Sequence, residues 1–427
     1  MDGGERSGGL WRLVVAAGWL AAAAGAIGCG SGSSSGSGSA IAGGHRDDKE
    51  GSGGTTGGNP GSGGASGGNP GSGGAPTAAG CAPLPSAPGV WAEISPPPGI
   101  TGFRASDAFP VGTDDFFFTG AVVDSNGIPS STHVLRWSHG CWTDELTYAP
   151  PPALSNFRPS VHGTGPADVW AVAGELIFHR DAQGWSPFAN DGWRAQLRQP
   201  LPFNNPLDLV RVRAAGVNDV WVAATAHMLR WNGSAWTVYN LDTAEYPNQS
   251  ASIGYNYYDF WFDGPNDVWI GATADQIGNT MDGGLAFHFN GTNFAPFPVN
   301  PGSAVYSVWR GGASLWLASL HLSFANGVTM TVPLQRLEGS TSEGVQVQGI
   351  GPNDSSPFFT TLWGRGANDL WASGDNVGHF DGQQWTLVTD APPATRSGPL
   401  DSVVTGDAGS VWLTAPGPRF FRRVTAP

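Results

Sequence analysis

Short runs in which apolar and polar residues alternate recur along most of the chain, separated by Gly, Asn and Asp. In one unit, residues 209–213 alternate, residues 216–219 are turn formers and residues 220–224 are largely apolar. A third run covers residues 227–231, and a fourth begins at Trp236 after an Asn-Gly pair. Period-two alternation between such turns predicts antiparallel strands. Each unit therefore predicts four strands, and the chain repeats the unit.

The hexapeptide Gly264-Pro-Asn-Asp-Val-Trp269 marks the turn and second strand of each unit. Its copies end in an aromatic residue at Phe117, Trp170, Trp221, Trp269, Trp316, Trp371 and Trp412. The intervals run from 41 to 55 residues, a period typical of propeller blades and longer than leucine-rich, ankyrin or TPR repeats. We expect these aromatic side chains to pack between neighbouring sheets, because burying one Trp removes a large apolar area from water.

The seventh unit is incomplete at the C-terminal end. It runs through Trp412 to Phe421, and the chain stops at Pro427 before a fourth strand. The missing strand is present at residues 88–94, which have no preceding strands of their own. Closing the ring in this way removes exposed sheet edges. The sequence therefore predicts an all-β, seven-bladed β-propeller that an N-terminal strand closes.

Residues 1–29 have the form of an export signal. Leu13 to Gly25 is an apolar run between a mildly basic start and Ala26-Ile27-Gly28-Cys29. The last four residues resemble a bacterial lipobox, although Ala26 stands where Leu is usual. The resemblance implies that Cys29 carries the lipid, and Gly30 after it favours the outer membrane or cell surface. Cleavage near Gly28 with free secretion is the alternative.

Residues 30–80 are rich in Gly and Ser and contain a duplicated nine-residue unit. Such a segment has few apolar side chains to bury, so we predict a disordered linker ahead of a propeller domain at 81–427. The remaining cysteines, Cys81 and Cys141, fall near the hairpin ends of blades that are neighbours in a ring. We expect them to form a disulfide, which persists outside the reducing cytoplasm.

Charge and composition limit the possible partners. The net charge is -14, and Lys49 is the only lysine. Nucleic-acid binding needs clustered Lys and Arg, so we expect none, and membrane contact only through the lipid anchor. Only 13% of the residues are charged, which is commoner among exported β-rich proteins than intracellular ones. We expect a monomer.

The repeats resemble BNR-like and photosystem-assembly-factor-like propellers, a group that includes bacterial lipoproteins with Gly-x-x-Asp-Val-Trp units. The resemblance covers residues 89–427 and implies a fold, not an activity. Three better-known patterns are absent: the sialidase Asp-box, the kelch double Gly and the WD40 Trp-Asp ending.

No motif identifies a reaction, a cofactor or a metal. The carboxylates at Asp115, Asp168, Asp219, Asp267 and Asp369 share one repeat position inside a tight turn, which favours a structural role over a catalytic pair. His179, His288 and His379 share a position with Arg136 and Arg230. Because a zinc site needs several ligands around one ion, a position that alternates with Arg does not predict metal binding.

Loop length differs between the two ends of the blades. Connections between strands two and three, and from strand four to the next blade, carry the insertions, and both classes emerge on one face of a propeller. We predict a binding surface there, with these candidates: Trp193, Arg194, Arg198, Tyr246, Tyr255, Tyr257, Tyr258, Asp275 and Asp282. The alternative is that loops tolerate such insertions without function.

The leading hypothesis is a non-enzymatic cell-envelope binding module that presents this face to a protein or glycan. A carbohydrate-active hydrolase or lyase with an unrecognised channel site is the alternative, and an envelope assembly scaffold is a third possibility.

Overall fold

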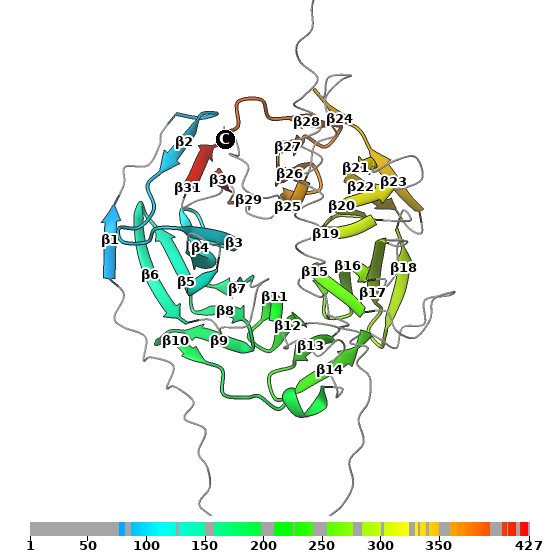
Figure 1. Cartoon of the computed structure of the whole chain (residues 1–427), viewed down its shortest axis with the longest axis horizontal. Coiled ribbons are helices and arrows are strands. Elements are labelled where there is room, and N and C mark those ends of the chain that lie inside the picture. Colours follow the sequence, from blue (N-terminus) through cyan, green and yellow to red (C-terminus); the bar gives the residue numbers. More distant parts are fainter. Residues whose placement is uncertain are drawn as a thin grey trace, which may run out of the picture. The chain divides into compact units, whose positions relative to one another are not determined.

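The computed structural model describes most of the chain from residue 77 onward (Figure 1). The described residues are 77–81, 87–124, 128–149, 158–197, 209–224, 227–241, 254–275, 284–299, 303–323, 329–331, 334–338, 341–349, 359–392, 404–407, 409–415 and 419–425. The chain divides into two compact units, Met1–Asn69 and Pro70–Pro427, and every described residue belongs to the second. In this part of the chain, no helix has the length and apolar character needed to span a bilayer. The expected signal peptide, Cys29 and nearly all of the expected linker lie outside the described residues.

The described strands form seven sheets around a common centre, which confirms the predicted seven-bladed propeller (Figure 1). Blade 1 contains β3 (Phe103–Gly112), β4 (Asp115–Val123), β5 (Pro129–Ser138) and β6 (Cys141–Tyr148), with β1 (Thr77–Cys81) outside β6. Blade 2 contains β7 (Ser160–Gly165), β8 (Asp168–Ala173), β9 (Leu176–Asp181) and β10 (Gly184–Pro187), followed by the short 3-10 helix η1 (Arg194–Gln196). Blade 3 contains β11 (Leu209–Gly216), β12 (Asp219–Ala224), β13 (His227–Trp231) and β14 (Trp236–Asn240).

Blades 4 to 7 follow the same order. Blade 4 contains β15 (Gly254–Gly264), β16 (Asp267–Asp275), β17 (Gly284–Phe289) and β18 (Phe294–Pro298). Blade 5 contains β19 (Ser303–Gly311), β20 (Ser314–Ser323), β22 (Leu334–Glu338) and β23 (Thr341–Val345), with β21 (Thr329–Thr331) beside β20. Blade 6 contains β25 (Phe359–Gly366), β26 (Asp369–Gly374), β27 (Val377–Phe380) and β28 (Trp385–Leu387), with β24 (Val347–Gln348) parallel to β28. Blade 7 contains β29 (Val404–Gly406), β30 (Ser410–Ala415), β31 (Arg419–Val424) and β2 (Trp91–Ile94).

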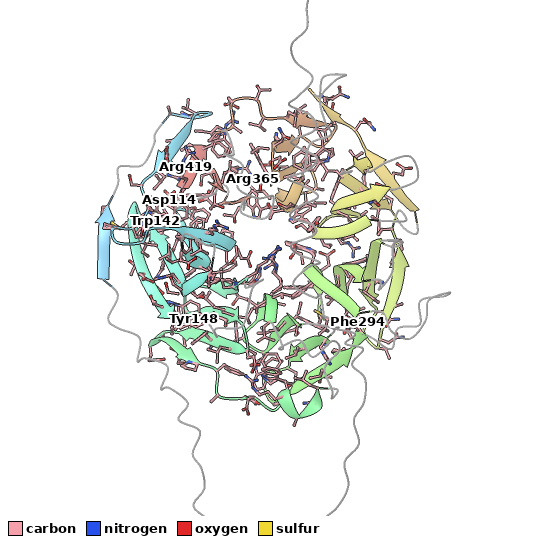
Figure 2. All side chains as sticks on the ribbon, in the orientation of Figure 1. Asp114, Trp142, Tyr148, Phe294, Arg365 and Arg419 are labelled. Carbon is pink, nitrogen blue, oxygen red and sulfur yellow. A yellow bond between two sulfur atoms is a disulfide. The ribbon has the colours of Figure 1, made fainter. Side chains whose placement is uncertain are left out.

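The ring closes between the N-terminal and C-terminal strands, as the split repeat predicts. β2 pairs antiparallel with β31 and supplies the fourth strand of blade 7. Trp412 of blade 7 packs against Phe116 and Phe118 of blade 1 in one buried cluster. The side chains of Asp114, Trp142 and Arg419 mark this seam in Figure 2. Closure therefore rests both on backbone pairing and on a shared aromatic core.

The sheet of blade 1 begins earlier in the chain than the predicted boundary at residue 81. β1 starts at Thr77 and adds a fifth strand to the outer edge of the blade, antiparallel to β6. Cys81 and Cys141 are opposite each other in this pairing and form a disulfide. The bond thus ties the start of the propeller to blade 1 itself. A disulfide of this kind indicates an oxidising, extracytoplasmic location.

Each motif aromatic packs against the following blade, which explains why the residue recurs once per sheet. Trp221 of blade 3, for example, contacts Phe289 and Phe294 of blade 4. All seven belong to clusters of this kind, although Trp269 is only partly buried. The second strands lie between two neighbouring sheets, so nearly every residue of β8, β12 and β30 is buried.

The hairpin between the third and fourth strands uses an Asn or Asp as a local cap. Asn232 Oδ1 accepts hydrogen bonds from the amides of Ser234 and Ala235. Gly233 has a φ of 90°, and a Cβ there would lie 2.6 Å from the side chain of Asn218. Only glycine meets both conditions, because other residues avoid positive φ and the space is filled.

Candidate functional site

The carboxylate of the repeated hexapeptide is held inside its own blade. Asp168 Oδ1 accepts hydrogen bonds from His179 Nε2 at 3.0 Å and from Trp170 Nε1 at 2.9 Å. The His179 ring stacks on Trp170 with a centroid distance of 4.2 Å. The three groups therefore form a compact unit that joins the second and third strands.

The same unit recurs around the ring. Asp267 with His288 and Trp269, and Asp369 with His379 and Trp371, repeat it with the same hydrogen bonds and ring contacts. In blades 1 and 3, Arg136 and Arg230 replace the histidine and lie over Phe117 and Trp221. Ser410 of blade 7 stands where Asp is usual, and there Arg422 pairs with Asp114 of blade 1.

The pKa values agree with a structural role for these acids. Burial by itself would raise the pKa of Asp168, but hydrogen bonds from His179, Thr164 and Trp170 outweigh it and hold that pKa below its usual range. Asp267 and Asp369 likewise have lowered pKa values, with Arg310 and Arg365 adding to their histidine partners. A general acid needs a raised pKa, so the lowered values disfavour that role for these three aspartates.

A second polar cluster lies on the first strands of the blades, which we call the inner strands. Most of its residues are close to, but not opposite, the motif aromatics. In each of blades 1 to 6, one inner-strand residue is opposite the position two residues after the motif aromatic. These residues are Asp107, Ser160, Arg211, Asp259, Ser307 and Thr361. This register position therefore carries a polar residue in each of blades 1 to 6.

Two arginines of β11 join two aspartates from different blades. Arg211 Nη1 lies 3.1 Å from Asp107 Oδ1, and Arg211 Nε lies 3.0 Å from Asp259 Oδ1. Arg213 Nη1 and Nη2 lie 3.2 Å and 3.1 Å from Asp107 Oδ2 and Asp259 Oδ1. All four side chains are at most 12% exposed. The two positive and two negative charges balance, so the cluster links blades 1, 3 and 4 without net charge.

Serine hydroxyls extend the cluster along the ring in two equivalent relays. Ser160 Oγ donates to Asp107 Oδ2 at 2.5 Å and accepts the amide of Val212 at 3.0 Å. Ser307 Oγ donates to Asp259 Oδ2 at 2.7 Å and accepts the amide of Leu362 at 3.1 Å. Each relay thus connects three consecutive blades, 1 to 3 and 4 to 6.

The electrostatics of the inner cluster are set by burial and by these pairs. Burial would raise the pKa of Asp107, but Arg211 and Arg213 outweigh it and lower that pKa to about 2. Burial and the charge of Arg213 lower the pKa of the neighbouring His162 to about 3. His162 Nδ1 accepts the amide of Ala214, so the ring is neutral at physiological pH. The cluster therefore offers paired charges rather than a free acid or base.

The predicted binding face is located by contacts of the first long insertion. Arg194, which follows blade 2, donates to Glu175 Oε2 at 2.7 Å and to the Glu175 carbonyl at 2.6 Å. Glu175 lies in the turn between β8 and β9, and the amide of Leu209 donates to the neighbouring Gly174 carbonyl. Both classes of connection thus emerge on one side of the blade, which we call the connection face. The opposite side, with turns such as Val217-Asn218, is the turn face.

Trp193 is not a surface residue, contrary to expectation. It is 2% exposed and belongs to the core cluster between blades 2 and 3. Arg194 covers its ring at 4.5 Å, and Gln196 Nε2 donates to the Trp236 carbonyl of blade 3 at 2.9 Å. The insertion folds back on blade 3 because burying the indole removes a large apolar area from water.

The other candidates lie in strands or outside the described residues. Tyr255, Tyr257 and Tyr258 belong to β15 and not to a loop, since that strand already begins at Gly254. Asp275 ends β16. Arg198, Tyr246 and Asp282 lie outside the described residues. Within the described ranges, no group of three or more His, Cys, Asp or Glu side chains could hold a metal ion.

The sequence interpretation missed the inner cluster. The charged residues of this cluster lie in strands whose sequences alternate apolar and polar positions. In such a sequence, a buried charged residue cannot be distinguished from one that faces solvent. The residues are Asp107, Arg211, Arg213 and Asp259. Aligning the first strands of the blades on the motif aromatic would have revealed Asp107, Arg211 and Asp259, because these three share one register position, and Arg213 is opposite the motif aromatic itself.

Comparisons with known proteins support the fold. No family model matches the sequence, and no curated protein matches it. YCF48 from Cyanidioschyzon merolae superposes with a TM-score of 0.52 at 12% identity, covering 78% of this chain and 99% of that one. YCF48 bound to a D1 peptide gives 0.49 at 15% identity, covering 81% and 100%. PorZ, a surface component of the type-IX secretion system of Porphyromonas gingivalis, gives 0.48 at 12% identity, covering 77% and 47%. This chain is a seven-bladed β-propeller similar in fold to YCF48.

Proposed function

We propose that this protein is an exported cell-envelope binding module that presents its connection face to a protein or glycan. In this proposal, a lipid on Cys29 and the segment between Cys29 and β1 tether the propeller to the outer membrane. The disulfide between Cys81 and Cys141 supports an extracytoplasmic site of action.

One observation carries the proposal: the connections between strands are longest on the connection face of a closed propeller. On the turn face, first and second strands are joined by short turns, such as Gly216 to Asp219 and Gly264 to Asp267. On the connection face, the chain takes the long routes from Pro187 to Leu209 and from Asn240 to Gly254. Loops on a rigid scaffold are where proteins place recognition residues.

The described start of the longest insertion supports this use of the face. Trp193 anchors it in the core, whereas the Arg194 and Glu175 side chains remain 38% and 44% exposed. An insertion fixed by a buried aromatic loses less conformational entropy on binding than a free loop would. Arg194 and Glu175 are polar, partly exposed and held on an anchored insertion, which suits recognition of a polar partner.

Binding to a glycan array and to chemically crosslinked envelope proteins tests the proposal with the full-length protein. Arg194→Glu on the connection face and Val217→Glu on the turn face form a matched pair, because both positions are exposed beside blade 3. We expect the first substitution to weaken binding and the second to leave it unchanged. Loss of binding only in Val217→Glu, or no binding by the native protein, would count against the proposal.

A further inference from the structure

Three polar side chains of blade 1 form a chain of hydrogen bonds outside both clusters described above. Ser131 Oγ lies 2.8 Å from His133 Nε2, and His133 Nδ1 lies 2.9 Å from Asp144 Oδ2. Ser131 and His133 are two residues apart on β5, so their side chains share a face. Asp144 is on the neighbouring strand β6.

An irregularity in the pairing of β5 with β6 brings the carboxylate to the histidine. The register shifts between Val134 and Leu135, so that Leu135 is opposite Asp144 and Val134 opposite Leu146. The extra residue is Glu145. Its side chain points away from His133, and its Oε2 accepts a hydrogen bond from Arg180 Nε of blade 2. Without this bulge, Asp144 would be at a different register position relative to His133.

Proton transfer along the chain has a direction when His133 carries its proton on Nδ1, which lies near Asp144 Oδ2 and, at 3.2 Å, near Thr147 Oγ1. With Asp144 accepting the proton on His133 Nδ1, the free lone pair of the ring is on Nε2, which faces the Ser131 hydroxyl. Thr147 Oγ1 also donates to Asp144 Oδ2 at 3.0 Å, which fixes the carboxylate further. Asp144 Oδ1 is buried and has no hydrogen-bond partner among the described residues.

Burial increases from the serine to the histidine, so the hydroxyl is the more accessible of the two groups. His133 is 8% exposed, and its ring contacts Phe103 edge-on at 6.4 Å. Ser131 is partly exposed near the start of β5, next to the connection between Val123 and Pro129. That connection joins the second and third strands, so Ser131 opens toward the connection face. Tyr148 is opposite Thr132 and ends β6, so it lies next to the start of β5 (Figure 2).

From this geometry we infer that Ser131 is a nucleophile for carboxylic esters, with His133 as its general base and Asp144 as the residue that orients the base. The serine oxygen attacks the carbonyl carbon, and its proton moves to His133 Nε2. The bond to the leaving alkoxide breaks, and that oxygen takes the proton from His133, which leaves an acyl group on Ser131. A water molecule then attacks the acyl carbon and gives a proton to His133 Nε2. The bond from that carbon to Ser131 Oγ breaks, and the serine oxygen takes the proton back, which releases the carboxylic acid. This activity goes beyond the proposed binding function and does not depend on it.

The acidic surroundings restrict the substrate class. The chain carries a net charge of -14, and the carboxyl group of Asp144 belongs to the site, so anionic acyl groups are disfavoured. The aromatic ring of Phe103 borders the base. A neutral ester of a small carboxylic acid fits these conditions.

Labelling of the full-length protein with a fluorophosphonate probe tests the nucleophile, because attack on phosphorus expels fluoride and leaves a stable adduct. We expect a covalent adduct on the peptide that contains Ser131, located by mass spectrometry. Ser131→Ala and His133→Gln should each reduce the labelling rate by about 100-fold or more. Ser130→Ala is the matched control, since Ser130 Oγ only donates to the Val122 carbonyl and its loss should change nothing.

A second comparison tests the residue that orients the base. Asp144→Asn should lower the labelling rate, while Ser130→Ala keeps the native rate. If His133→Gln fails to fold, Ser131→Ala and Asp144→Asn still decide the outcome, because both positions are partly exposed. Absence of an adduct, or equal labelling in Ser131→Ala and the native protein, would overturn the assignment.

Discussion

Arg211 Nη1 in blade 3 lies 3.1 Å from Asp107 Oδ1 in blade 1, so the guanidinium reaches past the blade that separates them in sequence. The same side chain contacts Asp259 of blade 4. Among the described residues, most of the ring contacts lie within a blade or between neighbouring blades, although His162 of blade 2 also contacts Phe262 of blade 4. The inner charge cluster is therefore a connection of longer range, and it makes blades 1 to 4 mechanically dependent on one another.

The first prediction concerns this cluster. Arg211→Met should lower the free energy of unfolding by about 3–5 kcal/mol, because it leaves buried carboxylates with less positive charge than they need. Arg194→Met removes a partly exposed ion pair and should cost below about 1 kcal/mol. Urea unfolding of both variants provides the measurement. Equal losses in the two would show that the inner ion pairs are not a significant part of stability.

The second prediction concerns pH. The folded-state pKa of His162, about 3, lies below the ordinary value of 6.5, so the unfolded chain binds a proton that the native protein does not. The contribution of His162 to the free energy of unfolding is therefore fully present above pH 6.5, and it is lost progressively as the pH drops toward 3. Between pH 7 and pH 5 this site should remove about 2 kcal/mol.

His162→Gln provides the control for this pH effect, because its side-chain oxygen can still accept the Ala214 amide and does not titrate. The native protein should lose more stability than the variant between pH 7 and pH 5, measured by urea unfolding. The depressed pKa of Asp107 acts only below about pH 4, so it does not overlap this window. Identical pH dependence in the two proteins would refute the assignment to His162.

The third prediction compares two motif tryptophans. Trp221 is fully buried between blades 3 and 4, whereas Trp269 is only partly buried. Trp221→Ala should destabilise by about 3–5 kcal/mol, and Trp269→Ala by less, because the cost follows the apolar contact that is lost. Thermal unfolding with both variants at one pH measures the difference. The reverse order would contradict the packing described for the two residues.

The fourth prediction concerns the disulfide. Replacing both Cys81 and Cys141 with Ser should lower stability by about 2–4 kcal/mol, since the bond closes a segment with a sequence separation of 60. Amide hydrogen exchange should accelerate in β1, because that strand pairs only with β6. Exchange in β2 should change little, since its pairing with β31 does not involve the cysteines. Slow exchange throughout β1 in the double variant would indicate that the strand is held by pairing alone.

The repeat pattern was sufficient to predict the ring and its closure. Trp412 and the lone strand at Trp91–Ile94 could be joined from sequence because a blade lacking one strand leaves an unpaired edge. β1 escaped prediction, because Thr77–Cys81 contains small residues without the alternation that marks a half-buried strand. It is a strand through its pairing with β6 and the disulfide, and neither leaves a local signal.

Sequence alone determined which residues repeat, and hence the number of blades, the turns and the aromatic wedges, since these depend on periodicity and local chemistry. The tertiary structure decided which side chains meet across blades. Trp193 became a core residue when its insertion folded back, and Asp107 met Arg211 when the ring closed. Ser131, His133 and Asp144 came together through one bulge between β5 and β6. Such contacts depend on register and ring geometry, which a linear pattern does not contain.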